Sequence, residues 1–263
     1  MAIAGKSGYL LALDVGNTHT VVGAFVGDKL VDSWRITSSS NRSEDELGVV
    51  LVRLLDLNGF SPDGIGGAII ASVVPPVTPI IERTIVKYLK CKPMIVGPGI
   101  RTGIRIHYES PKDVGADRIV NAIAAYERCH SACIVVDFGT ATTFDCVAHD
   151  GSYRGGLIVP GVNISLEALV SRAAKLPRIE LEKPAQVIGR NTVESMQAGV
   201  YFGYCALVEG IVARIRTEMR NEGPLRVMAT GGLSRIFAET DAIDEILPDL
   251  TLEGLKILWD RNQ

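Results

Sequence analysis

Short apolar runs separated by polar turns dominate the first third of the chain. Two such runs, from Leu10 to Phe25, are joined by the polar turn Asp14-Val-Gly-Asn-Thr18, which predicts a β-hairpin. Residues 29–37 predict a third strand. Ser43 and Glu46 form a capping-box signature before an apolar stripe at helical spacing. A strand over 67–74, a helix over 79–90 and a short strand over 93–96 complete a β-β-β-α-β-α-β order.

The same pattern begins again about half a chain length later. The run from Cys133 to Asp145 contains an apolar strand, an Asp-Phe-Gly-Thr turn at 137–140 and a return strand. We interpret this recurrence as an internal duplication, which gives two similar lobes. The elements expected after it are a glycine-rich strand and turn over 151–161, a helix over 162–172, an extended loop over 176–188, a helix that follows 189–195, and a strand over 226–230 that leads through Gly231-Gly232 into a helix.

Composition and charge narrow the function classes. The chain has 263 residues, of which 47% are hydrophobic and 22% charged, with a formal net charge of -3. This slight acidity argues against a nucleic-acid partner bound by a basic surface. The five cysteines include no C-x-x-C pair, which favours a reducing cytoplasm over a disulfide framework. The apolar stretch 68–81 is broken by prolines and is too short to span a membrane, and residues 1–7 lack an apolar targeting segment.

Each hairpin places a carboxylate beside a glycine turn. Asp14 is followed by a turn whose backbone N–H groups, with the Thr18 hydroxyl, can hold a phosphate. The acid then faces a phosphate-bound Mg²⁺, usually through water. One such turn alone is better explained as a capped hairpin, but two at half-chain spacing resemble the actin, hexokinase and Hsp70 nucleotide-binding superfamily. That resemblance implies an α/β fold of two RNase H-like lobes around a cleft, here residues 1–116 and 117–263.

The quartet Gly115-Ala-Asp-Arg118 leads into a helix with an apolar face. Asp117 therefore lies in the first turn, where the helix dipole favours the ionised carboxylate. For an isolated aspartate at this position, helix capping is the better explanation. Arg118 is a surface charge, or a donor of paired hydrogen bonds to a substrate carboxylate.

Taken together, these motifs resemble the type III pantothenate kinases over nearly the whole chain. The matching elements are Asp14–Thr18, Gly115–Arg118, Asp137 to Ala141, Gly155-Gly156 to Pro160-Gly161, and Asn191-Thr192. The resemblance implies ATP-dependent phosphorylation of the pantothenate hydroxyl, the first step of coenzyme A synthesis, by a cytoplasmic homodimer. It also places Gly231-Gly232 where the superfamily contacts adenosine.

The resemblance also implies residue roles. Asp117 matches the general base that accepts the proton of the hydroxyl, and Asp137 matches a ligand of an activating monovalent cation, K⁺ or NH₄⁺. The expected nucleotide contacts are Asp14, Val15, Gly16, Asn17, Thr18, His19, Thr20, Val21 and Thr140. The expected pantothenate contacts are Tyr108, Gly115, Ala116, Asp117, Arg118 and Thr192.

Two other functions stay open at this point. A sugar or acetate kinase of the same superfamily fits less well, because such chains are usually longer and lack the quartet at 115–118. A non-catalytic accessory or regulatory protein with this fold is the second alternative, and intact Asp14, Asp117 and Asp137 argue against it. Gly199, Gly203 and Gly210 on one helix indicate either a dimer interface or close packing inside one lobe.

Overall fold

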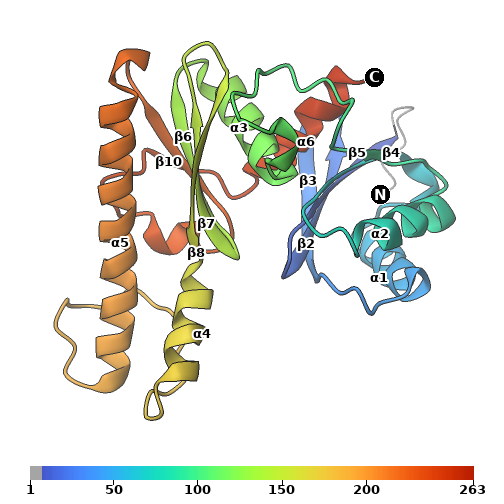
Figure 1. Cartoon of the computed structure of the whole chain (residues 1–263). Coiled ribbons are helices and arrows are strands. Elements are labelled where there is room, and N and C mark those ends of the chain that lie inside the picture. The colour runs from blue at the N-terminus through green and yellow to red at the C-terminus, as the bar shows by residue number, and fades with distance from the viewer. Residues whose placement is uncertain (1–7) are drawn as a thin grey trace. The chain divides into compact units, whose positions relative to one another are not determined.

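Two five-stranded sheets with the same strand order carry the fold in the computed structural model, which describes residues 8–263 (Figure 1). The first sheet has the order β3-β2-β1-β4-β5 and the second β8-β7-β6-β9-β10. Residues 1–7, where we expect no targeting segment, lie outside the described residues. The strands are β1 (Tyr9–Val15), β2 (His19–Val26), β3 (Lys29–Thr37), β4 (Ile65–Ser72), β5 (Met94–Ile95), β6 (Cys133–Phe138), β7 (Ala141–Val147), β8 (Tyr153–Pro160), β9 (Arg226–Thr230) and β10 (Glu245–Ile246).

The pairing within the two sheets confirms the duplication read from the sequence. β1 runs antiparallel to β2 and parallel to β4, and β6 likewise runs antiparallel to β7 and parallel to β9. Asp14 pairs with Val21 on its antiparallel neighbour, and Asp137 pairs with Thr143. The two aspartates therefore occupy equivalent positions, each one residue before the end of the first strand of its sheet.

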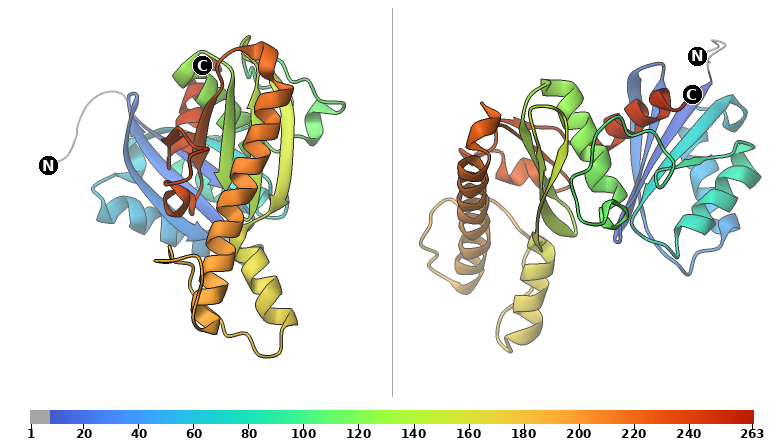
Figure 2. Two further views of the ribbon diagram at one scale, coloured as in Figure 1. Left: turned by 90° about the vertical axis from the view of Figure 1, so that its left-hand side faces the viewer. Right: turned by 45° about the horizontal axis from the view of Figure 1, so that its top comes forward.

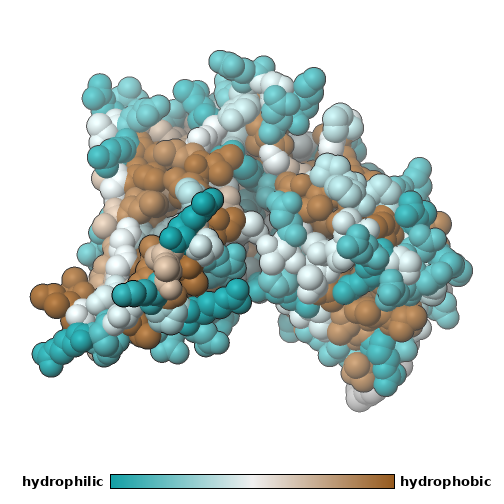
Figure 3. Space-filling model, turned by 60° about the horizontal axis from the view of Figure 1, so that its bottom comes forward, coloured by the Kyte–Doolittle hydropathy of each residue, from teal (hydrophilic) through white to brown (hydrophobic). Residues whose placement is uncertain are grey.

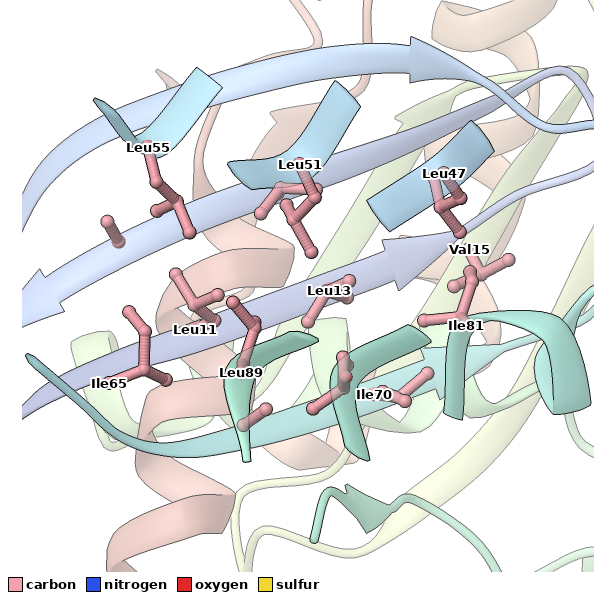
Figure 4. Close-up of a cluster of buried hydrophobic side chains, with 14 of the residues drawn as sticks. Leu11, Leu13, Val15, Leu47, Leu51, Leu55, Ile65, Ile70, Ile81 and Leu89 are labelled. Carbon is pink, nitrogen blue, oxygen red and sulfur yellow. The ribbon is translucent and has the colours of Figure 1, made fainter. Parts of the chain in front are cut away.

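The helices α1 (Glu44–Leu57) and α2 (Thr78–Thr84) cover one face of the first sheet. The capping box of α1 is present, with the Ser43 Oγ accepting from Glu46 N and the Glu46 carboxylate accepting from Ser43 N. The expected helix over 79–90 is α2 followed by a π-helical turn (η2, Ile85–Leu89) that ends at Lys90, whose φ is 57°. Figure 4 shows the core between these elements, formed by Leu11, Leu13, Val15, Leu47, Leu51, Leu55, Ile65, Ile70, Ile81 and Leu89 among others.

The C-terminal helix α6 (Leu250–Arg261) packs against the first sheet, and the sequence pattern did not predict it. Small residues make room for it. Leu252 occupies the space beside Gly23, and the Trp259 ring occupies the space beside Gly67. Gly254 in turn lies against Val120 of α3 (Ala116–Cys129). The sheet is thus covered on this side by a segment far away in the sequence.

In the second half of the chain, α4 (Val162–Arg172) has the expected bounds and α5 (Thr192–Glu218) is the long glycine-containing helix. Figure 2 shows α5 along a face of the second sheet, while α4 extends beyond the sheet edge. The Phe237 ring stacks on Phe138 at 4.9 Å and on Tyr201 of α5 at 5.7 Å between ring centroids. The helix expected after Gly232 is only a 3₁₀ turn, η5 (Ser234–Phe237). The other short helices are η1 (Pro62–Gly64), η3 (Pro111–Asp113) and η4 (Arg220–Glu222).

By length and composition alone, α5 is the one helix of residues 8–263 that is long and apolar enough to cross a membrane. The core helix of a soluble protein passes the same test. Tyr201, Tyr204, Val208, Val212 and Ile215 of α5 are all buried in the core of the second sheet. Packing against the second sheet therefore explains the apolar residues on the buried face of this helix.

The chain divides into two compact units, each built around one sheet. The first contains residues 8–103, 109–124 and 251–263, and the second contains 104–108 and 125–250. This differs from the single boundary after residue 116 expected from the sequence. The reason lies in packing: α6 and the first turns of α3 pack with the first sheet, whereas 104–108 pairs with β8.

Candidate active site

The first hairpin presents a compact set of polar groups at the end of β1. Asp14 is half-buried, whereas Asn17, Thr18 and His19 are exposed. The turn is closed by a hydrogen bond from Gly16 N to the carbonyl of His19, 3.0 Å long. The exposed part of this hairpin can contact a polar ligand through both backbone and side chains.

Two of the expected nucleotide-contacting residues, Val15 and Thr20, have buried side chains. Val15 belongs to the hydrophobic core, and Val21 pairs with Asp14 in the sheet. Thr20 is 1% exposed, and its hydroxyl lies 2.9 Å from that of Ser38. Val15 and Thr20 thus support the hairpin from inside, and a ligand reaches them only through their main chain.

The second hairpin repeats this geometry. Asp137 is half-buried, Thr140 is exposed, and Gly139 N donates to the carbonyl of Ala141 at 3.0 Å. Both turn glycines therefore use their own N–H groups to close the turn. This refines the expectation for phosphate binding, since the donors toward a phosphate must come from the residues that follow each glycine.

Two glycines from the glycine-rich motifs pack directly against this second hairpin. A Cβ on Gly231 would lie 2.5 Å from the Asp137 Oδ1, and one on Gly161 would overlap the Thr140 carbonyl oxygen. Gly231 also has a φ of 90°, which other residues rarely adopt. The glycine-rich motifs at 155–161 and 231–232 were the available signal, although they did not reveal what the glycines touch.

Asp117 lies in the first turn of α3, and the structure brings it to the same edge of the first sheet as Asp14. A Cβ on Gly115 would lie 3.5 Å from Val73, and Val73 N donates to the carbonyl of Val15 at 3.1 Å. Because β1 and β4 are parallel, their carboxyl ends meet at one edge. The N-terminus of α3 packs at that edge, beside the first hairpin.

The protonation of Asp117 differs from the expectation based on the helix dipole. Its Oδ1 accepts a hydrogen bond from Arg118 N at 2.8 Å, which favours the carboxylate. Burial has the larger effect, however, and raises the pKa of Asp117 above its ordinary value of 3.8. Arg118 is 7% exposed and so is part of the interior, which argues against the first of its two expected roles, a surface charge. A carboxyl group with a raised pKa near a reaction centre is a better proton acceptor than an ordinary aspartate.

The remaining candidate residues lie in the second unit. Tyr108 is 43% exposed, and its ring lies over Gly155 of β8. Thr192 is the exposed first residue of α5, directly after the N-cap Asn191, whose side chain accepts from Glu194 N at 2.9 Å. Each residue is thus held at the end or edge of a regular element.

A magnesium ion fits the first hairpin only together with a nucleotide. Within residues 8–263 the structure contains no group of three or more His, Cys, Asp or Glu side chains arranged to hold a metal. Mg²⁺ at kinase sites is bound by one or two carboxylates, by substrate phosphates and by water. Asp14, half-buried beside an exposed polar turn, offers one such carboxylate.

Known proteins resemble this chain in both sequence and fold. A family model described as type III pantothenate kinase matches residues 10–214. A type III pantothenate kinase of Myxococcus xanthus is 50% identical over 254 residues, covering 96% of this chain and 98% of its own. One of Geotalea daltonii is 51% identical over 255 residues, covering 97% and 99%. A ROK family glucokinase of Streptomyces griseus, crystallised with glucose and AMPPNP, covers 95% of this chain and 99% of its own, with a TM-score of 0.53 and 11% identity. This structural likeness, together with the two matching sheets, confirms the predicted α/β fold of two similar lobes.

Proposed function

The chain belongs to the type III pantothenate kinase family, and from that premise we propose how its own residues act. The enzyme is a kinase that phosphorylates pantothenate in coenzyme A biosynthesis. The residue assignments rest mainly on one observation. The Asp14 hairpin and the first turn of α3, which contains Asp117, lie at the same edge of the first sheet. Phosphoryl transfer requires positioning and charge neutralisation more than covalent chemistry, and a polar hairpin with a carboxyl group at the same sheet edge suits that requirement.

ATP binds through both hairpins. Asn17, Thr18 and His19 of the first and Thr140 of the second are the exposed residues that contact its phosphates. Asp14 holds Mg²⁺ on those phosphates, directly or through water. The bound ion neutralises charge on the transferring phosphoryl group.

Asp117 acts as the general base. A primary hydroxyl is a weak nucleophile, and a carboxylate within hydrogen-bond reach accepts its proton as the oxygen attacks the phosphorus. Its raised pKa increases its basicity, while the hydrogen bond from Arg118 N fixes one oxygen. The second oxygen is then the one that takes the proton.

Pantothenate contacts Tyr108, Gly115, Ala116, Arg118 and Thr192 in addition to Asp117. The guanidinium group of Arg118 suits a carboxylate, which it can bind with two parallel hydrogen bonds. Asp137 binds an activating K⁺ or NH₄⁺ ion. A half-buried carboxylate beside the turn carbonyls of the second hairpin is a suitable ligand set for such an ion.

The active form is a homodimer that uses α4 and α5. A Cβ on Gly199 or Gly203 would meet nothing within 4 Å, so these glycines are not explained by packing inside one chain. Ile164 and Leu169 of α4 and Val193 of α5 are more than 40% exposed. A groove of about 720 Å³ runs beside α4. Figure 3, viewed from the side where α4 projects, shows hydrophobic residues gathered on the left. A second copy of the chain, docked through the same surface, would remove these exposed apolar side chains from water.

The dimer is tested by light scattering at micromolar concentration. We expect a mass of twice 28.2 kDa. Gly203→Leu should give monomers, because one chain has room for the added side chain but an interface does not. The control is Asp56→Leu, which adds the same side chain to an exposed position of α1. Monomeric wild type, or an unaffected mass for Gly203→Leu, contradicts this interface.

We place the enzyme in the cytoplasm, without a nucleic-acid or membrane partner. The net charge of -3 offers no general attraction to nucleic acid. Cys91, Cys133 and Cys205 are thiols, as a reducing compartment favours.

A coupled assay for ADP release tests the function. We expect ADP only when ATP and pantothenate are both present, and none when glucose or acetate replaces pantothenate. ADP release with a sugar would identify a sugar kinase. Absence of ADP with every acceptor, from a protein that binds ATP, would identify a non-catalytic accessory protein.

A further inference from the structure

The edge strand β8 contains a bulge at Arg154 and Gly155. Cys146 of β7 pairs with Gly155, but the next residue, Val147, pairs with Tyr153, so Arg154 is the extra residue. Gly155 has a φ of 97°, a backbone conformation that residues with a Cβ rarely adopt. A bulge of this kind turns the strand locally and often redirects side chains near a functional site.

The bulge coincides with the docking of a short segment from elsewhere in the chain. Ile106 forms a parallel bridge with Tyr153. Tyr153 N donates to the Arg105 carbonyl and His107 N donates to the Tyr153 carbonyl, each at 2.8 Å. Residues 104–108 thereby belong to the second unit, although their neighbours on both sides belong to the first.

Tyr108 ends this docked segment, and its ring covers Gly155. A Cβ on Gly155 would lie 3.6 Å from the ring carbons Cδ2 and Cε2, an ordinary van der Waals distance. The ring therefore leaves space for a methyl group, and the backbone conformation is what requires glycine. Tyr108 remains 43% exposed, so one side of its ring is fixed and the rest is open to a ligand.

The side chain of Tyr153 anchors the bulge from inside. Tyr153 and Asp145 are both 0% exposed, and the Tyr153 hydroxyl donates to the Asp145 carboxylate at 2.8 Å. Thr143 donates to the other carboxylate oxygen at 3.1 Å. Two hydroxyl donors to one buried carboxyl group hold these side chains in place, because a buried polar group that loses a hydrogen bond costs free energy.

We infer that Gly155 and Tyr153 are positioning residues for the substrate: the bulge they form in β8 holds Tyr108 as a fixed wall of the pantothenate site. This inference rests on the proposed function, which assigns Tyr108 to pantothenate. It extends that function to two residues that contact no substrate themselves. Tyr108 is the one candidate residue within 4 Å of a Cβ on Gly155, so we expect substitutions in the bulge to raise the KM for pantothenate and leave the KM for ATP unchanged.

The test is steady-state kinetics with each substrate varied in turn. Tyr108→Ala should raise the KM for pantothenate about tenfold or more, and Gly155→Ala about tenfold, with the KM for ATP within about twofold of wild type. The double variant should resemble Tyr108→Ala, because both changes act through one contact. Additive effects, or a wild-type pantothenate KM in folded Gly155→Ala, would overturn the inference.

The matched control is Gly59→Ala, in the turn after α1. Gly59 has a φ of 79°, and a Cβ there would meet nothing within 4 Å. The change likewise places alanine at a positive φ, but in the other unit, so both KM values should stay unchanged; a raised pantothenate KM in this control would attribute the effect to general destabilisation.

If Gly155→Ala does not fold, the pantothenate KM of Tyr153→Phe tests the inference instead. This variant removes only the hydroxyl donated to Asp145, and the pantothenate KM should rise about threefold. A wild-type value overturns the inference. A different result would show that the proposed function itself is wrong. In that case Tyr108→Ala keeps the wild-type KM for pantothenate, or no pantothenate-dependent ADP forms.

Discussion

Replacing Asp117 with asparagine separates its chemistry from its structural role. Asparagine keeps the size of the side chain and one oxygen that can accept the 2.8 Å hydrogen bond from Arg118 N. It cannot accept the proton of the attacking hydroxyl. General-base catalysis contributes roughly 10²–10⁴-fold, and at about 1.36 kcal/mol for each factor of ten this is about 2.7–5.4 kcal/mol of activation free energy. We expect kcat to fall by that factor while ATP binding persists.

The stability of the same variant provides an independent readout. The pKa of Asp117 is raised in the folded state, so between the ordinary value of 3.8 and the raised value the folded chain holds more protons than the unfolded chain. The free energy of unfolding therefore falls as pH rises through this window, and at neutral pH the ionised carboxylate is destabilising. Asp117→Asn should melt at or above the wild-type temperature at pH 7, with the difference shrinking as pH falls toward 3.8.

The assay combines ADP release at saturating ATP with thermal melts across the pH range. Wild-type activity should fall as pH drops through the raised pKa of Asp117, because only the ionised form accepts a proton, and the variant should lack this acid limb. A variant that melts like wild type and keeps more than about a tenth of its kcat, far short of the expected range, would remove Asp117 from the mechanism.

Three further substitutions test the positions around these groups. Gly115→Ala places a Cβ 2.5 Å from the Asp117 Oδ1, so the carboxylate must move; kcat should fall about 10–100-fold with ATP binding intact, and unchanged turnover would contradict the assignment. Asp137→Asn should abolish most of the stimulation by K⁺ relative to Na⁺, whereas an unchanged ratio would exclude Asp137 as the cation ligand. Gly161→Ala overlaps the Thr140 carbonyl and should raise the KM for ATP about tenfold without changing that for pantothenate; the reverse selectivity would refute nucleotide binding by this hairpin.

The elements with local signals were predictable from the sequence. The capping box at Ser43 and Glu46 is defined by residues three apart, and the hairpins at Asp14 and Asp137 by turns between apolar runs. Helix α4 has the predicted bounds. These features depend on hydrogen bonds and burial within a few residues, so a single sequence contains the information that determines them.

Features that depend on distant contacts were not predictable. Helix α6 packs over the first sheet because Gly23 and Gly67 leave room for its Leu252 and Trp259, and nothing in a local pattern connects these positions. The pKa of Asp117 has the same origin. Its place in a first helical turn indicated an ionised carboxylate, but burial by residues remote in the sequence reverses the direction of the shift.

The glycines of the candidate site illustrate why a motif can be recognised before its physical cause is known. Gly161 has a φ of -70°, which any residue adopts, so the Thr140 carbonyl alone excludes a side chain there. A Cβ on Gly155 would meet the Tyr108 ring at an ordinary van der Waals distance, so the φ of 97° alone requires glycine there. A side chain at position 161 therefore clashes with the second hairpin, which must move. A side chain at position 155 instead strains the backbone of β8, which must change its conformation. Substitutions at these two glycines of one motif should thus change the KM for different substrates, ATP for position 161 and pantothenate for position 155.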